Sequence, residues 1–261
     1  MPLVRVAKVM LMDTNHLLQI EHLQIKLPAM DRAILQNIHY TINPGDFVVV
    51  LGGNGSGKSS LIKAINRTYP ISSGKILFQQ KPIANYSQAD FAKQVITLTQ
   101  DTSHSLFNDL TVLENCLLWE LRHESVSLRY ATLTQRQFFH DYLAAFNAQL
   151  PEKLDTTCSR LSGGEKQALI LALCLRHPPT LLLLDEHTSA LDPKTGHYIM
   201  GRTHAELIQH HITCVMTTHD LDDAMAYGNR LLALKEGKIV YQADGEQKQQ
   251  LKRSDLLTFC Y

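Results

Sequence analysis

The chain has 261 residues, a length that suits one α/β domain with an inserted subdomain better than two full domains. Hydrophobic residues make up 44% of it and charged residues 19%, a balance that excludes an intrinsically disordered chain. Lysine plus arginine and aspartate plus glutamate both number 25, so charge gives no argument for nucleic acid or anionic lipid, and we expect no nucleic-acid partner.

The five cysteines are odd in number and far apart, and none forms a C-x-x-C pair, so we expect reduced thiols rather than a disulfide or zinc framework. Arg5 and Lys8 interrupt the apolar N-terminal segment. Every apolar run falls well short of the roughly 18 residues that a membrane span needs. The sequence therefore predicts a chain that is neither exported nor membrane-spanning.

Strand-like runs come first along the chain, at residues 17–27 and 34–42, and their succession predicts an antiparallel layer. Wholly apolar runs follow, each before or after a helical pattern, which is typical of buried parallel strands. These runs occupy residues 47–51, 95–98, 180–185 and 212–217.

Residues from about 110 to 150 have a different sequence pattern, because leucines and aromatic residues recur there at helical spacing. They predict a helical subdomain inserted at about 101–160 in a single domain that spans residues 1–261. After residue 228, the segment NRLLALKEGKIVYQA predicts a last hairpin around Glu236 and Gly237.

The segment GGNGSGKS links the run at 47–51 to a helical pattern and matches G-x-x-x-x-G-K-[ST]. Its glycines let backbone N–H groups turn toward a phosphate chain, Lys58 can reach the β- and γ-phosphates, and Ser59 can offer its hydroxyl to Mg²⁺. The alternative, a glycine-rich turn without function, does not need a strand before it and a helix after it. The expected ATP-binding residues are Gly52, Gly53, Asn54, Gly55, Ser56, Gly57, Lys58, Ser59 and Ser60.

The run LLLLDE ends in two acids, Asp185 and Glu186, which could hold Mg²⁺ and polarise a water molecule. Taken alone, the pattern equally fits a buried strand that meets solvent. His219, at the end of another apolar run, is by itself more typical of a structural residue, and Gln100 of a solvated loop.

LSGGEKQ, residues 161–167, opens a helix with a capping box between Ser162 and Glu165. Each glycine within that box destabilises a helix by roughly 1 kcal/mol relative to alanine. A helix selected only for stability would not carry Gly163 and Gly164 in its first turn.

In the order GGNGSGKSS, Gln100, LSGGEKQ, LLLLDEHTSALD and His219, the chain resembles the nucleotide-binding subunits of ATP-binding cassette (ABC) transporters along nearly its whole length. LSGGEKQ is similar to the signature motif of that family, and SALD at 189–192 is similar to its D-loop. LLLLDEHTSALDPKT, followed by YGNRLLALKEGKIV, is similar to ATPases of bacterial importers of small organic solutes.

The resemblance implies an α/β P-loop NTPase core of mainly parallel sheet, with an N-terminal antiparallel β layer and an inserted helical subdomain. It implies that the chain binds and hydrolyses MgATP and so powers solute transport through a separate membrane permease. The transport it implies is import of a small organic solute such as an amino acid. Its further implications are a head-to-tail homodimer with ATP, a solute-binding protein in the same system, and a peripheral position on the cytoplasmic face of the cell membrane.

The same resemblance assigns roles to individual residues. Ser59, Gln100 and Asp185 would hold Mg²⁺, and Gln100 would also sense the permease. Glu186 would act on the attacking water, and His219 would contact the γ-phosphate and help to place that water. Ser162, Gly163, Gly164 and Glu165 would cover the γ-phosphate held by the partner subunit, where a Cβ at either glycine would push the helix away.

Two residues depart from the family pattern. Glu165 stands where glutamine is most frequent, which adds a negative charge near a phosphate and could weaken closure driven by ATP. Leu27 stands where many members place an aromatic residue against adenine, so we expect base recognition by apolar contact alone.

Two alternatives remain open at this point. The chain could be a soluble cassette that never meets a permease, as in iron–sulfur assembly. It could also be a nucleotide-gated adaptor with little turnover, a reading that Glu165 favours slightly and the complete set of catalytic residues opposes.

Overall fold

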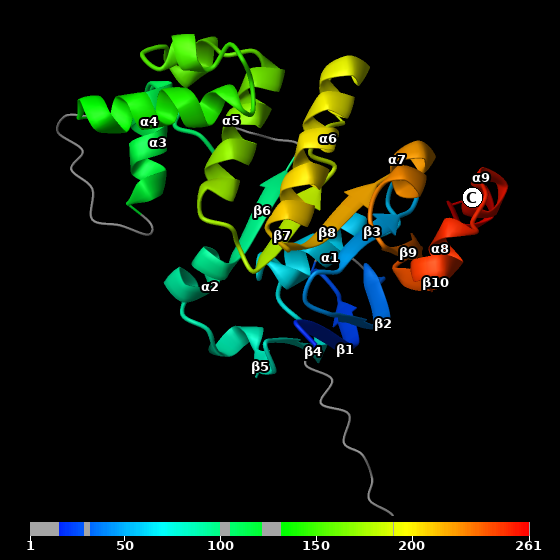
Figure 1. Cartoon of the computed structure of the whole chain (residues 1–261). Coiled ribbons are helices and arrows are strands. Elements are labelled where there is room, and N and C mark those ends of the chain that lie inside the picture. Colours follow the sequence, from blue (N-terminus) through cyan, green and yellow to red (C-terminus); the bar gives the residue numbers. More distant parts are fainter. Residues whose placement is uncertain (1–15, 29–31, 100–104, 122–131, 190, 261) are drawn as a thin grey trace, which may run out of the picture.

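The computed structural model describes residues 16–28, 32–99, 105–121, 132–189 and 191–260. These residues form two β-sheets with helices between and around them (Figure 1). The α/β class with one antiparallel and one mainly parallel sheet, predicted from the sequence, is confirmed. Gln100 lies outside the described residues, so its assignment stays a prediction.

Six strands form the central sheet in the order β10-β9-β3-β8-β7-β6. All of them run parallel except β10, which pairs antiparallel with β9. Because parallel strands end at the same edge, the loops that follow β3, β7 and β8 meet there. The strands span Phe47–Leu51 (β3), Val95–Thr99 (β6), Leu181–Asp185 (β7), Thr213–Thr218 (β8), Arg230–Lys235 (β9) and Lys238–Asp244 (β10).

The second sheet is antiparallel, in the order β2-β1-β4-β5. Only β1 and β2 were predicted from the sequence. The structure adds β4, which lies beside β1 with Leu18 opposite Phe78, a pairing across 60 positions that no local pattern reveals. The strands span Leu18–Ile25 (β1), Leu35–Ile42 (β2), Ser73–Phe78 (β4) and Lys81–Pro82 (β5).

Two hydrophobic clusters cover the two faces of the central sheet, and alternate residues of its strands belong to each. Val48 and Val50 of β3 face a cluster shared with the antiparallel sheet and with α1 (Lys58–Ile65). Val49 and Leu51 face the opposite cluster, which includes α5 (Gly163–Arg176) and α6 (Pro193–Gln209). Burial on both faces explains why the predicted parallel strands are continuously apolar.

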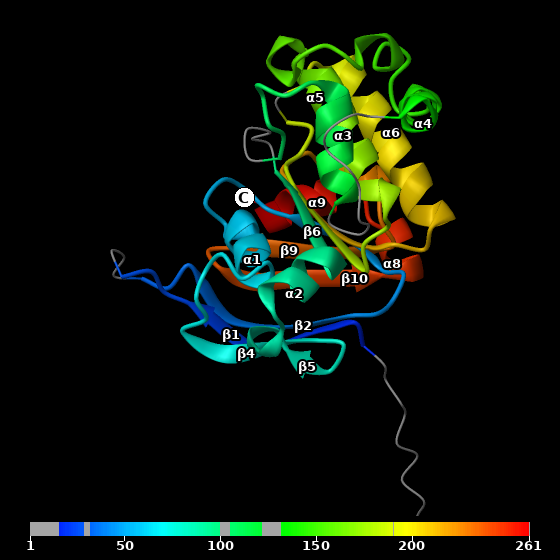
Figure 2. The ribbon, with the colours of Figure 1, turned by 90° about the vertical axis from the view of Figure 1, so that its left-hand side faces the viewer.

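Helices α3 (Val112–Glu120) and α4 (Leu133–Ala144) lie between β6 and α5 in the chain, where amphipathic helices were predicted. Both begin with a capping box, at Thr111 and Thr132, and both contribute to the cluster around α5. Figure 2 shows these helices on the side of the central sheet opposite the antiparallel sheet. The subdomain boundaries near 101–160 remain a prediction.

The remaining helices are shorter or terminal. They are α2 (Gln88–Gln94), α7 (Leu221–Ala226), α8 (Gly245–Gln249) and α9 (Arg253–Cys260). Among the helices that the structure describes, none has both the length and the apolar character needed to cross a membrane.

Four cysteines of the described residues are buried and form no disulfide with one another: Cys116, Cys158, Cys174 and Cys214. Burial raises the pKa of the Cys158 thiol to about 11 and raises the pKa values of Cys116 and Cys214 further. Thiols with such pKa values carry little thiolate at neutral pH and react slowly.

Candidate functional site

The phosphate-binding loop connects the buried strand β3 to α1, and two of its glycines have a local structural reason. A Cβ on Gly52 would lie 2.4 Å from the carbonyl oxygen of Leu234 and 2.5 Å from Oγ of Ser56. Gly57 precedes α1 with φ of 106°, a backbone conformation that side chains disfavour. The loop can therefore turn its backbone inward only with glycine at these two positions.

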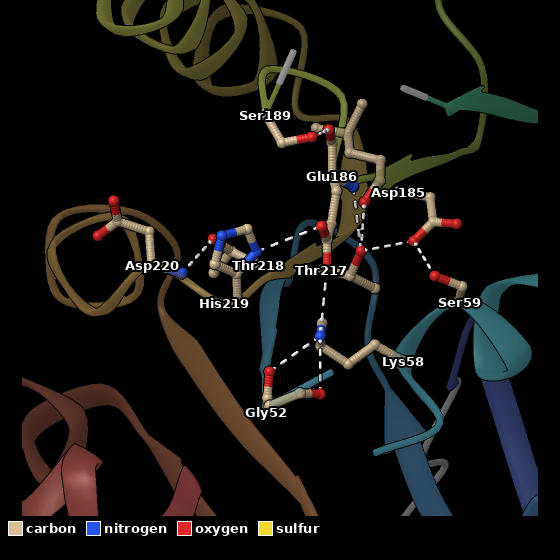
Figure 3. A network of polar contacts seen from close by, with 12 residues as sticks. Gly52, Lys58, Ser59, Asp185, Glu186, Ser189, Thr217, Thr218, His219 and Asp220 are labelled. Atoms are coloured by element: carbon tan, nitrogen blue, oxygen red, sulfur yellow. Dashed lines mark hydrogen bonds and ion pairs between the residues drawn. The ribbon is translucent and has the colours of Figure 1, made fainter. Parts of the chain in front are cut away.

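Lys58 is buried at the first position of α1. Its ammonium group donates hydrogen bonds to the carbonyl oxygens of Gly52 at 2.9 Å and Gly53 at 3.2 Å. It also forms an ion pair of 3.2 Å with Oε1 of Glu186 (Figure 3). The ammonium group is thus held at the base of the loop. From there it can exchange these partners for a phosphate oxygen.

Asp185, at the end of β7, accepts two hydroxyl hydrogen bonds on the same oxygen. Ser59 Oγ donates to Oδ1 at 2.9 Å, and Thr217 Oγ1 from β8 donates to it at 2.8 Å. Figure 3 shows the three residues converging from α1, β7 and β8. A carboxylate beside a hydroxyl is an oxygen donor set that suits Mg²⁺, so these residues fit the expected metal.

Glu186 has an unusual backbone that several contacts hold in place. Its φ is 47°, and its N–H donates to Thr217 Oγ1 at 3.1 Å. Its carbonyl oxygen accepts hydrogen bonds from the backbone N–H and the hydroxyl of Ser189, at 3.1 and 2.7 Å. The side chain lies between Lys58 and His219, whose Nδ1 is 3.2 Å from Oε2 of Glu186.

A cleft of about 1400 Å³ opens above the loop and is large enough for a nucleoside triphosphate. Its lining includes seven of the nine predicted loop residues, Lys58 among them, together with Asp185 and Glu186. Leu27, Arg32 and Tyr69 also lie in the wall of the cleft. Leu27 is thus available for the apolar contact expected with a base. The seven loop residues are Asn54, Gly55, Ser56, Gly57, Lys58, Ser59 and Ser60.

The signature residues lie apart from this cleft. Residues 162–165 begin α5, and none of them lines it. The predicted capping box is present, with Glu165 N–H donating to Ser162 Oγ at 3.3 Å and Ser162 N–H donating to Oε2 of Glu165 at 3.0 Å. A single chain therefore brings Lys58, Asp185, Glu186 and His219 together, and leaves the start of α5 elsewhere.

The two signature glycines differ in their surroundings. A Cβ on Gly164 would lie 2.6 Å from Cγ2 of Thr195 at the start of α6, closer than such contacts occur. A Cβ on Gly163 would meet nothing nearer than Leu191 Cδ2 at 3.7 Å, an ordinary contact. Gly164 thus has a packing reason within the chain, whereas the described residues offer no such reason for Gly163.

Lys153, which no motif predicts, pairs with Glu165. Its Nζ lies 2.5 Å from Oε1 of Glu165, which is buried. Burial raises the pKa of Glu165, but the hydrogen bonds from Lys153 and Ser162 lower it more, so its net pKa lies below the usual value. Glu165 is thus an ionised carboxylate whose charge is compensated.

His187 is a second residue that the sequence analysis missed. It follows Glu186 directly and is buried, and its Nε2 has no hydrogen-bond partner among the residues that the structure describes. Burial lowers the pKa of His187 to about 4, so the ring is neutral at physiological pH. The only sequence signal was the position of a histidine beside the two acids.

Comparison with known proteins gives concordant results. A family model described as ABC transporter matches residues 35–189. The chain is 32% identical over 244 residues to the tyrosine transport ATP-binding protein of Clostridioides difficile (strain R20291), covering 92% of this chain and 97% of that protein. It is also 32% identical over 234 residues to the phosphonates import ATP-binding protein PhnC of Bdellovibrio bacteriovorus, covering 88% and 89%.

Among solved structures, the chain is similar to cbiO1 from Clostridium perfringens, described as part of the ABC transporter complex cbiONQ. The TM-score is 0.73 at 27% identity, and the match covers 88% of this chain and 89% of that chain.

Proposed function

Because the chain belongs to the ABC transporter family, as an ATP-binding subunit with ATPase activity, we propose that it drives import of a small organic solute through a separate permease. The observation that carries the proposal is the convergence of Lys58, Asp185 and Glu186 in one cleft. The import direction draws support from the name of the phosphonates import relative, and an amino acid as solute from that of the tyrosine transport relative.

In the proposed mechanism, Lys58 leaves Glu186 and holds the β- and γ-phosphates together with the N–H groups of the loop. Ser59 and Asp185 hold Mg²⁺, which when bound neutralises charge on the phosphate oxygens. Glu186 orients the attacking water, and His219, 3.2 Å from it, fixes that carboxylate and reaches toward the γ-phosphate. Gln100 keeps its proposed place as a further metal ligand.

We assign Ser162, Gly163, Gly164 and Glu165 to the nucleotide of a partner subunit. The separation between α5 and the cleft supports this assignment, because a second copy in head-to-tail orientation can supply what one chain does not bring together. Each subunit of the resulting homodimer would then complete the site of the other. The proposal treats residues 1–261 as one ATPase domain with a helical subdomain at about 101–160.

The proposed partners are an integral membrane permease and a solute-binding protein, with the chain at the cytoplasmic face of the membrane. The relative cbiO1 is described as part of a transporter complex, which supports association with membrane components. The adaptor alternative drew on the charge of Glu165. The ion pair with Lys153 compensates that charge and removes this support.

The test is reconstitution of the full chain in proteoliposomes with any permease whose gene neighbours its own. We expect MgATP-dependent uptake of a labelled amino acid, with labelled methylphosphonate as the competing solute, and no uptake with the Lys58→Ala variant. ATP hydrolysis that no permease stimulates, together with absent uptake, would favour the soluble alternative.

A further inference from the structure

The third residue of α5 is a buried acid in a helix start that, on the proposed function, must receive a phosphate. Both oxygens of Glu165 are engaged, because Oε2 accepts the N–H of Ser162 at 3.0 Å and Oε1 accepts the ammonium group of Lys153 at 2.5 Å. The contact between Oε2 and the N–H of Ser162 closes the capping box, and it does so whether or not Oε1 is paired with a cation. A capped helix therefore does not by itself require Lys153.

Lys153 is held in place by its surroundings. It ends a short 3₁₀ helix, Pro151–Lys153, between the buried residues Leu150 and Leu154. Its N–H donates to the carbonyl oxygen of Leu150 at 3.0 Å, and its own carbonyl oxygen accepts from the N–H of Thr156 at 2.8 Å. Its side chain is one-third exposed, against 7% for that of Glu165. The cation is thus presented to the start of α5 by a fixed backbone.

Removing this cation would leave an ionised carboxylate, largely shielded from water, at the start of α5. Two negative charges a few ångströms apart repel strongly where water does not screen them. The repulsion would oppose the approach of a γ-phosphate, and it would disappear if Glu165 were a neutral amide. The effect of the lysine should therefore depend on the acid.

We propose that Lys153 is a positioning residue for ATP-driven assembly: it supplies the counter-charge that lets the signature helix accept a partner subunit's γ-phosphate with glutamate at position 165. This inference rests on the proposed head-to-tail function and extends it to a residue outside the signature motif. Lys153 acts through Glu165 and need not touch the nucleotide.

The experiment measures the mass of the full chain in solution by light scattering as MgATP is titrated. The background is Glu186→Gln, which slows hydrolysis. Four further substitutions are compared in it: Lys153→Met, Lys153→Arg, Lys153→Met combined with Glu165→Gln, and Lys75→Met. The last is the matched control, because Lys75 forms a 3.0 Å pair with Glu21 on the antiparallel sheet.

We expect Lys153→Met to raise the ATP concentration that gives half-maximal dimer by at least about tenfold. Lys153→Arg and Lys75→Met should need nearly the same ATP concentration as the parent, which is the Glu186→Gln chain. The double variant should recover most of the lost dimerisation. Binding of a fluorescent ATP analogue to dilute monomer should be equal in all of them, because Lys153 does not line the cleft.

Rescue by Glu165→Gln is the decisive readout, since a purely structural lysine would not be rescued by neutralising its partner. Normal dimerisation of Lys153→Met would overturn the proposed counter-charge, and so would a double variant as impaired as the single one. Absence of any ATP-dependent shift in the parent would overturn the head-to-tail assembly and this role with it. The parent curve therefore separates failure of the proposed function from failure of the lysine alone.

Discussion

The ammonium group of Lys58 lies 3.2 Å from the carboxylate of Glu186. The lysine that we expect to bind the phosphates and the acid that we expect to orient the attacking water are therefore paired with each other. The pair is largely shielded, because the lysine is 5% exposed and the glutamate side chain 22%. A phosphate that binds in the loop must compete with Glu186 for Lys58. Nucleotide binding and release of the catalytic acid are then one event.

The Glu186→Gln variant separates the two consequences of this pairing. We expect turnover to fall by at least about 100-fold, since a general base is lost. ATP should bind as tightly as before or more tightly, because the amide no longer competes for Lys58. Phosphate release and nucleotide titration measure the two effects. Turnover near that of the parent would contradict the assignment of Glu186.

Thr217 is expected to be a positioning residue, although no motif includes it. Its hydroxyl donates to Asp185 at 2.8 Å and accepts the N–H of Glu186 at 3.1 Å. Thr217→Val keeps the shape of the side chain and removes both contacts, so we expect kcat to fall while KM for ATP changes less. Loss of these buried hydrogen bonds should also lower the free energy of unfolding by about 1–3 kcal/mol.

The control for Thr217→Val is Thr213→Val at the other end of the same strand. Thr213 is equally buried, and its hydroxyl accepts the N–H of Gly45 at 2.9 Å, away from the catalytic residues. It should lose stability without losing kcat. Equal kinetic effects in the two valine variants would show that Thr217 acts only through the fold.

The two signature glycines should respond differently to alanine. Gly163→Ala has room for the new methyl group, so we expect the isolated chain to gain up to about 1 kcal/mol of stability and to lose ATP-driven dimerisation. Gly164→Ala would press on Thr195 and should lower stability by about 1–3 kcal/mol, as overpacking does. Urea unfolding and light scattering with MgATP measure the two effects.

Thr195→Ser provides the control, because it deletes the Cγ2 atom that the new methyl group would meet. It should restore the stability of Gly164→Ala. If Gly163→Ala dimerised normally, the partner's phosphate would not approach the start of α5 closely enough to exclude a side chain.

His187 should make stability depend on pH. Its pKa is about 4 in the folded chain, against the ordinary value of 6.5 in the unfolded chain. Between these values the unfolded chain binds more protons, so the free energy of unfolding falls as the pH falls from 6.5 toward 4. From pH 7.5 to pH 5.0 the loss should be about 2 kcal/mol, by the linkage between proton binding and unfolding.

His187→Leu removes the titrating ring and should remove that part of the pH dependence. Urea unfolding of both chains at the two pH values measures the difference between them. An identical pH dependence in the two chains would show that the imidazole is not held neutral. The leucine also removes the buried Nε2, for which the described part of the chain offers no hydrogen-bond partner.

The sequence predicted the parts of the site that lie in short continuous motifs. The phosphate-binding loop, Asp185 and Glu186 stand at the ends of apolar strands, and parallel strands end at one edge, so their meeting could be expected. Thr217 was hidden inside a strand whose every residue is buried. Lys153 lies in a short 3₁₀ helix, and its contact with Glu165 spans 12 positions without a periodic pattern.

Strand β4 was missed for a similar reason, because its partner β1 lies 60 positions away and its first half is exposed. Gln100 remains a prediction. The tertiary contact, rather than local propensity, decides such elements.

The burial of Cys116, Cys158, Cys174 and Cys214 makes the chain suitable for site-specific labelling. A maleimide dye reacts with exposed thiolate, so these four residues can stay in place while Cys260 is replaced and one new cysteine is added at an exposed position such as Leu133. Energy transfer between labelled copies would then report the distance between subunits during each ATP cycle.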